Sequence, residues 1–204
     1  SRILEECLRK YNIPYIIYGG LSFYQRKEIK DAVSYMRLVT NPDDDEALKR
    51  IINFPARGIG DTTVNKLVAA ANLQKTSIWD LIQNINVADV NINAGTKSKL
   101  NAFRELISGF QNMNEKGSDA AEITSEIIRS TKMLSMLISD KTPESISKQE
   151  NLQELVNAVR QYVDTKLEEG YITRHLVYNE RPSVMYADEN PDKITYEQMN
   201  LFDI

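Results

Sequence analysis

A glycine-containing turn at residues 54–63 is the strongest candidate for a functional site in this sequence. Its residues, Phe-Pro-Ala-Arg-Gly-Ile-Gly-Asp-Thr-Thr, stand between two segments whose apolar residues recur at helical spacing. A helix, a Gly-hydrophobic-Gly hairpin and a second helix can present backbone amides to a phosphate, because glycines permit close approach and the second helix begins with its positive dipole end. Such contacts grip a nucleic-acid backbone without reading its sequence. The residues predicted to bind are Arg57, Gly58, Ile59, Gly60, Asp61, Thr62, Thr63 and Lys66.

A second turn of the same kind follows at residues 93–99. Gly95 opens another helical segment there, with Lys97 and Lys99 close behind it. Phosphate binding by Gly95, Thr96 and Lys97 is therefore a second prediction. A plainer interpretation stays open for both turns, in which the glycines only form tight turns between helices and the lysines are solvated surface charges.

Other kinds of site chemistry find no support in the residues. Cys7 is the single cysteine and His175 the single histidine, so the chain can form neither an internal disulfide nor a zinc-ligand set. No Gly-x-x-x-x-Gly-Lys-Ser/Thr loop is present to hold the phosphates of ATP, and no serine or cysteine stands in a nucleophile motif. The acidic run 43–45 precedes a helical segment and is predicted to cap it rather than to bind a metal. We therefore expect no cofactor and no metal in this chain.

The composition is that of a folded domain with a negative net charge. Apolar residues make up 42% of the chain and charged residues 26%, which are ordinary globular values. The net charge of −4 argues against a surface that coats nucleic acid by bulk charge, so any DNA contact must be local. No run of about 18 apolar residues occurs, and the first residues do not form a signal peptide. We expect a cytoplasmic location, no membrane partner and, since no initiator Met is present, a piece excised from a longer protein.

Hydrophobic spacing predicts a mainly α fold, a multi-helical region preceded by a small N-terminal α/β part. Residues 2–11 are predicted to form a short helix and residues 15–18 a buried strand. From residue 27 onward the apolar period is that of helices, the first of which is expected to stop at Asn41-Pro42, and seven or eight helices are expected in all. Residues 86–94 are rich in asparagine and are predicted to be a connection.

Polar residues at several positions are predicted to start these helices. They are Asp43 or Asp44, Asp61 or Thr62, and Ser77, followed by two sequences with capping-box spacing, Asp119-x-x-Glu122 and Ser147-x-x-Glu150. Arg26, Glu28 and Asp31 are expected to form a charge cluster on the surface.

An ordered series of short motifs also runs through roughly the first 165 residues. It consists of residues 1–6, 13–15, 18–20, Phe23, Arg26, 28–31, 41–45, 50–53, Pro55, 57–60 and 150–155. In this order the series closely resembles the UvrD/PcrA/Rep helicases of superfamily 1. Such a resemblance is specific, because many short motifs must occur in the correct succession.

The resemblance implies a place within a larger enzyme. In that family two RecA-like domains bind ATP between them and move along single-stranded DNA in the 3′ to 5′ direction, while a mobile helical accessory domain, called 2B, contacts duplex DNA and regulates unwinding. Residues 1–24 resemble part of the second RecA-like domain and residues 25–165 resemble the 2B region, whereas residues 166–204 are a divergent C-terminal segment or tail. The family's phosphate loop, its Asp-Glu magnesium motif and its motif V do not occur in this sequence. ATP and Mg²⁺ are therefore expected for the parent helicase, and this chain alone is expected to be inactive.

Two functional hypotheses stay open at this point. In the first, the chain is a fragment of a 3′ to 5′ ATP-dependent DNA helicase that works with the remainder of the helicase, contacts the backbone of a single-strand/duplex junction and regulates unwinding. In the second, it is a protein-interaction module that binds a repair or transcription partner without appreciable DNA binding. The second hypothesis is supported by the negative net charge and by the apolar, acidic stretch 199–204. Salt dependence separates them, because phosphate contacts release counterions.

Overall fold

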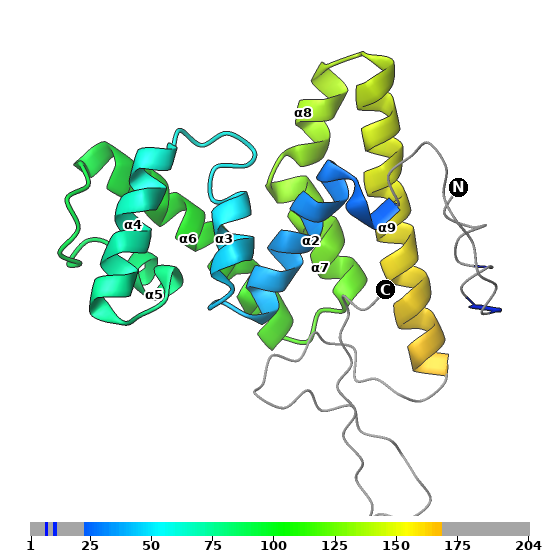
Figure 1. Cartoon of the computed structure of the whole chain (residues 1–204). Helices are drawn as coiled ribbons and strands as arrows, with labels where there is room; N and C mark the ends of the chain where they lie inside the picture. The colour runs from blue at the N-terminus through cyan, green and yellow to red at the C-terminus, as the bar shows by residue number, and fades with distance from the viewer. Residues whose placement is uncertain (1–6, 8–9, 12–22, 169–204) are drawn as a thin grey trace, which may run out of the picture.

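A computed structural model of the 204-residue chain describes residues 7, 10, 11 and 23–168. From Phe23 onward the described residues form one 3₁₀ turn and eight α-helices, with no strand among them (Figure 1). The elements are η1 (Phe23–Gln25), α2 (Lys27–Thr40), α3 (Asp45–Ile51), α4 (Asp61–Gln74), α5 (Ile78–Gln83), α6 (Ala94–Glu115), α7 (Ala120–Ser130), α8 (Met133–Ser139) and α9 (Pro143–Glu168). The mainly α fold predicted from hydrophobic spacing is confirmed for this part of the chain.

Several predictions fall wholly or largely on other residues. The strand at 15–18 lies outside the described residues, as do most of the short helix at 2–11 and of the RecA-like part at 1–24. The C-terminal segment 166–204 is described only as far as the end of α9. These assignments, with the domain boundaries that depend on them, stay predictions.

Helix α2 lies at the centre of the helical body (Figure 1). Its apolar residues recur at helical spacing, and the face that they form is buried. The buried apolar residues are Ile29, Ala32, Tyr35, Met36, Leu38 and Val39. The helix ends at Thr40, because Asn41 takes an extended conformation before Pro42, as the sequence predicts. Helices α3, α6, α7 and α9 all pack against α2.

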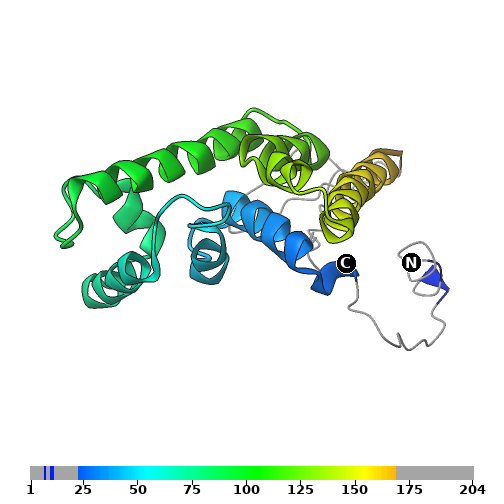
Figure 2. The ribbon, with the colours of Figure 1, turned by 90° about the horizontal axis from the view of Figure 1, so that it is seen from above.

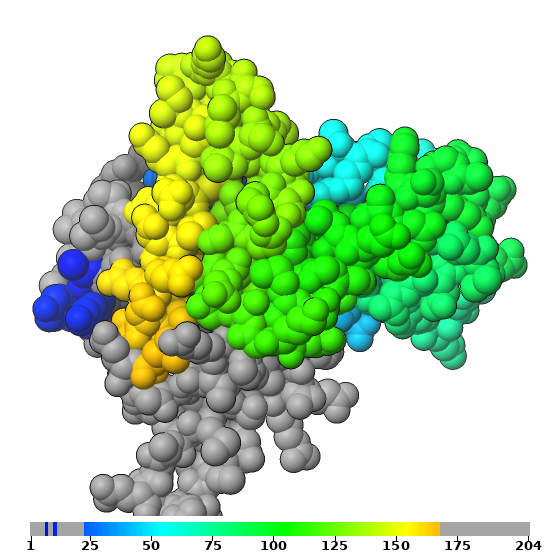
Figure 3. Space-filling view, turned by 180° about the vertical axis from the view of Figure 1, so that it is seen from behind, coloured from blue at the N-terminus to red at the C-terminus, as the bar shows by residue number. Residues whose placement is uncertain are grey.

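The 22-residue helix α6 connects the two ends of the molecule. Figure 2 shows it running along one edge, from the end that contains α4 and α5 to the end that contains α7, α8 and α9. Its buried side chains form a single stripe of Leu100, Phe103, Ile107 and Phe110. In the view from behind, the end with α4 and α5 stands out from the rest of the body (Figure 3). Both candidate turns are in this outer end, at the starts of α4 and α6.

Three of the predicted helix caps are confirmed. The Asp44 side chain accepts a hydrogen bond from the amide of Ala47 at 2.9 Å and so begins α3. Ser77 caps α5 in the same way, accepting from the amide of Asp80 at 3.1 Å. At α7, Asp119 and Glu122 form a reciprocal capping box in which each side chain accepts from the other residue's amide.

The second predicted capping box, Ser147-x-x-Glu150, is wrong. Helix α9 begins at Pro143, so Ser147 and Glu150 lie within the helix. Thr142 provides the cap instead, because its hydroxyl accepts from the amide of Ser145 at 3.2 Å. Proline suits the first position of a helix, since its missing N–H would have no partner there.

Candidate nucleic-acid interface

The glycine hairpin between α3 and α4 is held in shape from inside. Its central residue, Ile59, is fully buried, so the side chain between the two glycines anchors the turn in the core. The Asn53 side chain accepts hydrogen bonds from the amides of Arg57, at 2.9 Å, and of Ile59, at 3.1 Å. Asn53 was not among the predicted site residues, although it belongs to the motif 50–53 that carries the family resemblance. The two amides that it occupies are directed into the turn and are not free for a ligand.

The Arg57 side chain is also used within the protein. Its guanidinium donates to three backbone carbonyls, those of Ile51 at 3.0 Å, Phe54 at 2.9 Å and Pro55 at 3.2 Å. The same group donates to the Tyr35 hydroxyl at 2.6 Å and lies 5.4 Å from the centre of the Phe103 ring. Arg57 therefore pins the segment before the glycines to α2 and α6, and its charge reaches the surface only in part.

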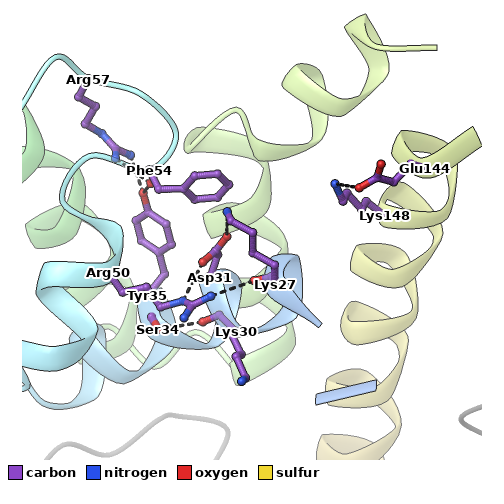
Figure 4. Close-up of polar contacts among 10 residues, drawn as sticks. All are labelled: Lys27, Lys30, Asp31, Ser34, Tyr35, Arg50, Phe54, Arg57, Glu144 and Lys148. Carbon is purple, nitrogen blue, oxygen red and sulfur yellow. Dashed lines mark hydrogen bonds and ion pairs between the residues drawn. The ribbon is translucent and has the colours of Figure 1, made fainter. Parts of the chain in front are cut away.

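Tyr35 of α2 is the side chain whose hydroxyl accepts the hydrogen bond from Arg57 (Figure 4). Its side chain is fully buried, and its hydroxyl donates to the carbonyl of Phe54, which precedes a cis peptide bond to Pro55. Burial raises the pKa of Tyr35 to about 12, and the neighbouring Arg57 guanidinium opposes this rise. The hydroxyl thus keeps its proton and continues to donate to the turn at neutral pH.

Helix α4 begins directly after the hairpin with unpaired backbone amides. Gly60 is the N-cap residue and Asp61 the first residue of the helix, and no side chain caps it. The prediction that Asp61 or Thr62 caps α4 is therefore wrong, because both already lie inside the first turn. Thr63 donates back to the Gly60 carbonyl at 2.9 Å. In the described part of the chain, the amides of Gly58, Gly60, Asp61 and Thr62 have no hydrogen-bond partner, and all four residues are exposed.

The two glycines of the hairpin differ in what they require. Gly58 has a φ of +69°, in the left-handed region that disfavours a side chain, and an added Cβ would lie 2.6 Å from the Lys99 amine. Gly60 has an ordinary φ of −79°, and an added Cβ would have no atom within 4 Å. Gly58 is thus needed by the fold of the turn itself, whereas Gly60 keeps the surface open in front of α4.

The structure brings the two predicted turns together. The Lys99 amine, from the first turns of α6, donates to the Gly58 carbonyl at 3.1 Å. Asn93 caps α6 by accepting from the amide of Thr96 at 2.8 Å, so Gly95 lies in the first turn of the helix, as predicted, and is exposed. Two candidate sites that are far apart in the sequence therefore form one surface, made by the starts of two helices.

Three lysines belong to this surface. Lys66 is exposed and donates to the Asn91 carbonyl at 2.8 Å, which ties α4 to the connection before α6. Lys99 is exposed as well, and Lys97 is half-buried. The exposed carboxylate of Asp61, at the start of α4, offsets part of their positive charge. The local charge is positive on balance, although the chain as a whole is negative.

The charge cluster predicted for the surface at Arg26, Glu28 and Asp31 is in fact largely interior. Glu28 is 8% exposed and Asp31 2%. Asp31 binds Arg50 of α3 at 2.7 Å and Lys27 at 2.9 Å, as Figure 4 shows. The sequence indicated the charges but not that Arg50 of α3 reaches Asp31 and that Asn151 of α9 reaches Glu28.

No further site chemistry is visible in the described residues. Among them no group of three or more His, Cys, Asp or Glu side chains could hold a metal ion, and Asp44 of the acidic run 43–45 serves as a helix cap. None of the helices in this part of the chain combines the length and apolar character that a membrane crossing needs. What the described residues do provide is a surface of exposed amides and lysines.

Fold and surface together define a class of protein: the described residues form a mainly helical module with a helix-hairpin-helix turn, four of whose backbone amides are exposed and unpaired. Comparison with known protein families identifies the family to which the chain belongs. The chain belongs to the UvrD-like helicase C-terminal domain family, whose model matches residues 1–201. The match continues well beyond residue 155, where the ordered series of motifs ends.

The relatives are bacterial DNA helicases. The chain is 38% identical to the ATP-dependent DNA helicase PcrA of Bacillus subtilis over 162 residues, which is 79% of this chain and 22% of that protein. It is 38% identical to DNA helicase II of Haemophilus influenzae over 169 residues and 35% identical to DNA helicase II of Escherichia coli over 163 residues. These matches cover 80% and 79% of this chain and 22% of each relative. The chain thus spans less than a quarter of the length of these relatives.

Proposed function

We propose that this chain is the helical accessory region of a 3′ to 5′ ATP-dependent DNA helicase, where it contacts duplex DNA at a single-strand/duplex junction and regulates unwinding. ATP and Mg²⁺ are bound by other regions of the parent helicase, and this chain carries no complete ATPase site of its own. The DNA and the remainder of the helicase are its partners, and the cytoplasm is its location. The kinship with PcrA and DNA helicase II supports this proposal.

One observation carries the DNA-binding part of the proposal. The amides of Gly58, Gly60, Asp61 and Thr62 are exposed and unpaired in the described structure, at the start of a 14-residue helix and next to Lys99. A helix start offers both N–H donors and the positive end of the helix dipole, which suits a phosphate. The contacts are to the DNA backbone and do not distinguish base sequence.

The predicted site residues divide into two roles under this proposal. Gly58, Gly60, Asp61 and Thr62 contact one phosphate through their backbone amides, and Thr63, whose amide donates to the Gly60 carbonyl, closes the turn behind them. Arg57 and Ile59 hold the hairpin in the required shape from inside. The second contact, to a neighbouring phosphate, comes from the lysines and the start of α6. Its residues are Lys66, Gly95, Thr96 and Lys97, with Lys99 between the two contacts.

The test is fluorescence anisotropy of a labelled single-strand/duplex junction titrated with the chain at low and at moderate salt. We expect binding that weakens as salt rises and that is stronger for the junction than for single-stranded DNA of the same length. Gly60→Ala is the informative variant, because it adds a methyl group in front of the amides without backbone strain or an internal clash. Loss of one such contact, worth about 1 kcal/mol, lowers the affinity roughly fivefold.

Gly109→Ala is the matched control. Gly109 is exposed on α6, has open space around its Cβ position and belongs to neither turn. We expect it to leave DNA affinity unchanged and to raise stability slightly, since alanine favours a helix interior by roughly 0.5–1 kcal/mol. If the folded Gly60→Ala variant binds the junction DNA with the same affinity as the unsubstituted chain, the hairpin is not the DNA contact. Absence of binding at both salt concentrations would favour the role in binding a repair or transcription partner.

A further inference from the structure

A groove lies between α2 and α3 on one side and α9 on the other, and its volume is about 810 Å³. Its apolar lining includes Val33 and Met36 of α2 and Leu155 and Val159 of α9. A cavity of this size, with an apolar floor, has the dimensions of a binding site for a few large side chains.

The rim of this groove is basic, although the chain is acidic. Lys30, Arg37, Lys49 and Arg50 line it, against the single carboxylate of Glu46. Three of the four cations already have carboxylate partners, since Arg37 binds Asp44, Lys49 binds Glu46 and Arg50 binds Asp31. Lys30 is exposed and has no such partner among the described residues, and Figure 4 shows its side chain directed away from the Asp31 cluster.

These features favour an apolar occupant with a few carboxylates over a chain of phosphates. Phosphates gain nothing from an apolar floor, and cations that are already paired have little charge left to offer them. An apolar peptide segment fills such a floor and needs one or two acidic side chains for the rim.

The sequence of this chain contains a segment of that chemistry, 197–204, which reads Glu-Gln-Met-Asn-Leu-Phe-Asp-Ile. We propose that this segment binds in the groove between α2, α3 and α9, with its Met, Leu, Phe and Ile side chains on the apolar floor and its carboxylates at the basic rim. The tether permits it, because α9 lines the groove up to Tyr162 and the 28 residues at 169–196 can span roughly 90 Å when extended. This interaction is separate from the DNA surface at the starts of α4 and α6.

A spin label on the segment tests the proposal in the whole chain. Cys7→Ser and Asn200→Cys together give one attachment site within 197–204. We expect the methyl signals of Val33, Leu155 and Val159 to lose intensity with the oxidised label and to recover when the label is reduced. Val87 stands in the connection between α5 and α6, is not part of the groove lining and is expected to keep its intensity.

Matched variants show whether the predicted contacts are responsible. Lys30→Glu reverses an exposed rim charge and is expected to abolish the intensity loss, as is replacement of both Leu201 and Phe202 by serine. Lys141→Glu makes the same charge change at an exposed position between α8 and α9, away from the groove, and is expected to have no effect.

Four outcomes would overturn the proposal. The intensity loss could be absent, or equal at Val87. It could be just as large when spin label and isotope label are on different molecules, which would place the segment of a second copy in the groove. An oligothymidine could shift the groove methyls while the segment leaves them unchanged, which would make the groove a nucleic-acid site.

Discussion

The Asn151 side chain of α9 donates a hydrogen bond to the Glu28 carboxylate of α2 at 2.6 Å, across 123 positions of sequence. Its amide oxygen accepts from the Arg26 guanidinium. Glu28 and Asn151 are each 8% exposed, so water does little to satisfy them. Both residues belong to motifs that resemble the helicase family, 28–31 and 150–155, and the structure shows that these two motifs meet.

This bond predicts that Asn151→Ala is strongly destabilising. The variant leaves a buried carboxylate without its donor and the Arg26 guanidinium without its acceptor, and such losses cost roughly 2–4 kcal/mol. The free energy of unfolding, measured by urea titration with circular dichroism, should fall by this amount. Gln153→Ala removes an exposed amide two residues away and serves as the control, for which little change is expected. Equal midpoints for the two variants would contradict the prediction.

Arg57→Lys tests whether the Arg57 side chain stabilises the hairpin through its internal hydrogen bonds. A lysine keeps the charge but cannot make the four hydrogen bonds to Ile51, Phe54, Pro55 and Tyr35, because it lacks the planar fork. We expect a loss of roughly 1–3 kcal/mol in the free energy of unfolding. Lys66→Arg, the reverse exchange at an exposed position, should change stability little. If Arg57→Lys is as stable as the parent chain, the role of Arg57 as an internal pin is wrong.

The sequence predicted those features that depend on neighbouring residues. The apolar stripe of α2, its end before Pro42 and the caps at Asp44, Ser77 and Asp119 all follow from local spacing and local hydrogen bonding, and the structure confirms them. Where two local signals competed, the prediction failed. Ser147-x-x-Glu150 has the spacing of a capping box, but Thr142 and Pro143 start the helix one turn earlier.

Features that depend on distant parts of the chain could not be predicted in the same way. Asp31 and Glu28 look like surface charges in the sequence, yet Arg50 and Asn151 reach them from 19 and 123 positions away. Likewise, the two glycine turns appear as separate candidates until the contact between Lys99 and Gly58 joins them over 41 positions. Only the packing of α2 against its neighbours determines which charges are buried.

The buried hydroxyl of Tyr35 predicts a loss of stability at high pH. Its pKa is about 12 in the folded protein, whereas an unfolded tyrosine has a pKa of about 10. Between these values the folded state holds a proton that the unfolded state has released, so the free energy of unfolding falls as pH rises. The contribution of this one group between pH 9 and pH 11 is about 1 kcal/mol.

Tyr35→Phe provides the comparison for this pH effect. The variant loses the hydrogen bonds to Phe54 and Arg57 and should be less stable at every pH. Its stability should nevertheless fall less steeply than that of the parent chain above about pH 10, because the group that titrates is gone. Urea unfolding at several pH values between 8 and 11 measures both slopes. Parallel slopes would show that Tyr35 does not titrate differently in the two states.

The Asp61 carboxylate is expected to stabilise the fold and to weaken DNA binding. The carboxylate lies in the first turn of α4, where a negative charge stabilises the helix, so Asp61→Asn should lower the free energy of unfolding by about 0.3–1 kcal/mol. The same carboxylate repels a phosphate at the amides of Gly60 and Thr62. The variant should therefore bind the junction DNA about two- to fivefold more tightly at low salt, with the gain shrinking as salt rises.

Asp164→Asn is the matched control for Asp61→Asn, because it removes one exposed carboxylate from α9, away from both glycine turns. It changes the net charge of the chain equally, so any general electrostatic effect on DNA affinity appears in both variants. A gain in affinity at position 61 alone, accompanied by lower stability, places a phosphate at the start of α4. Equal gains in both variants would mean that DNA responds only to net charge, and a loss of affinity at position 61 would mean that Asp61 itself makes a favourable contact.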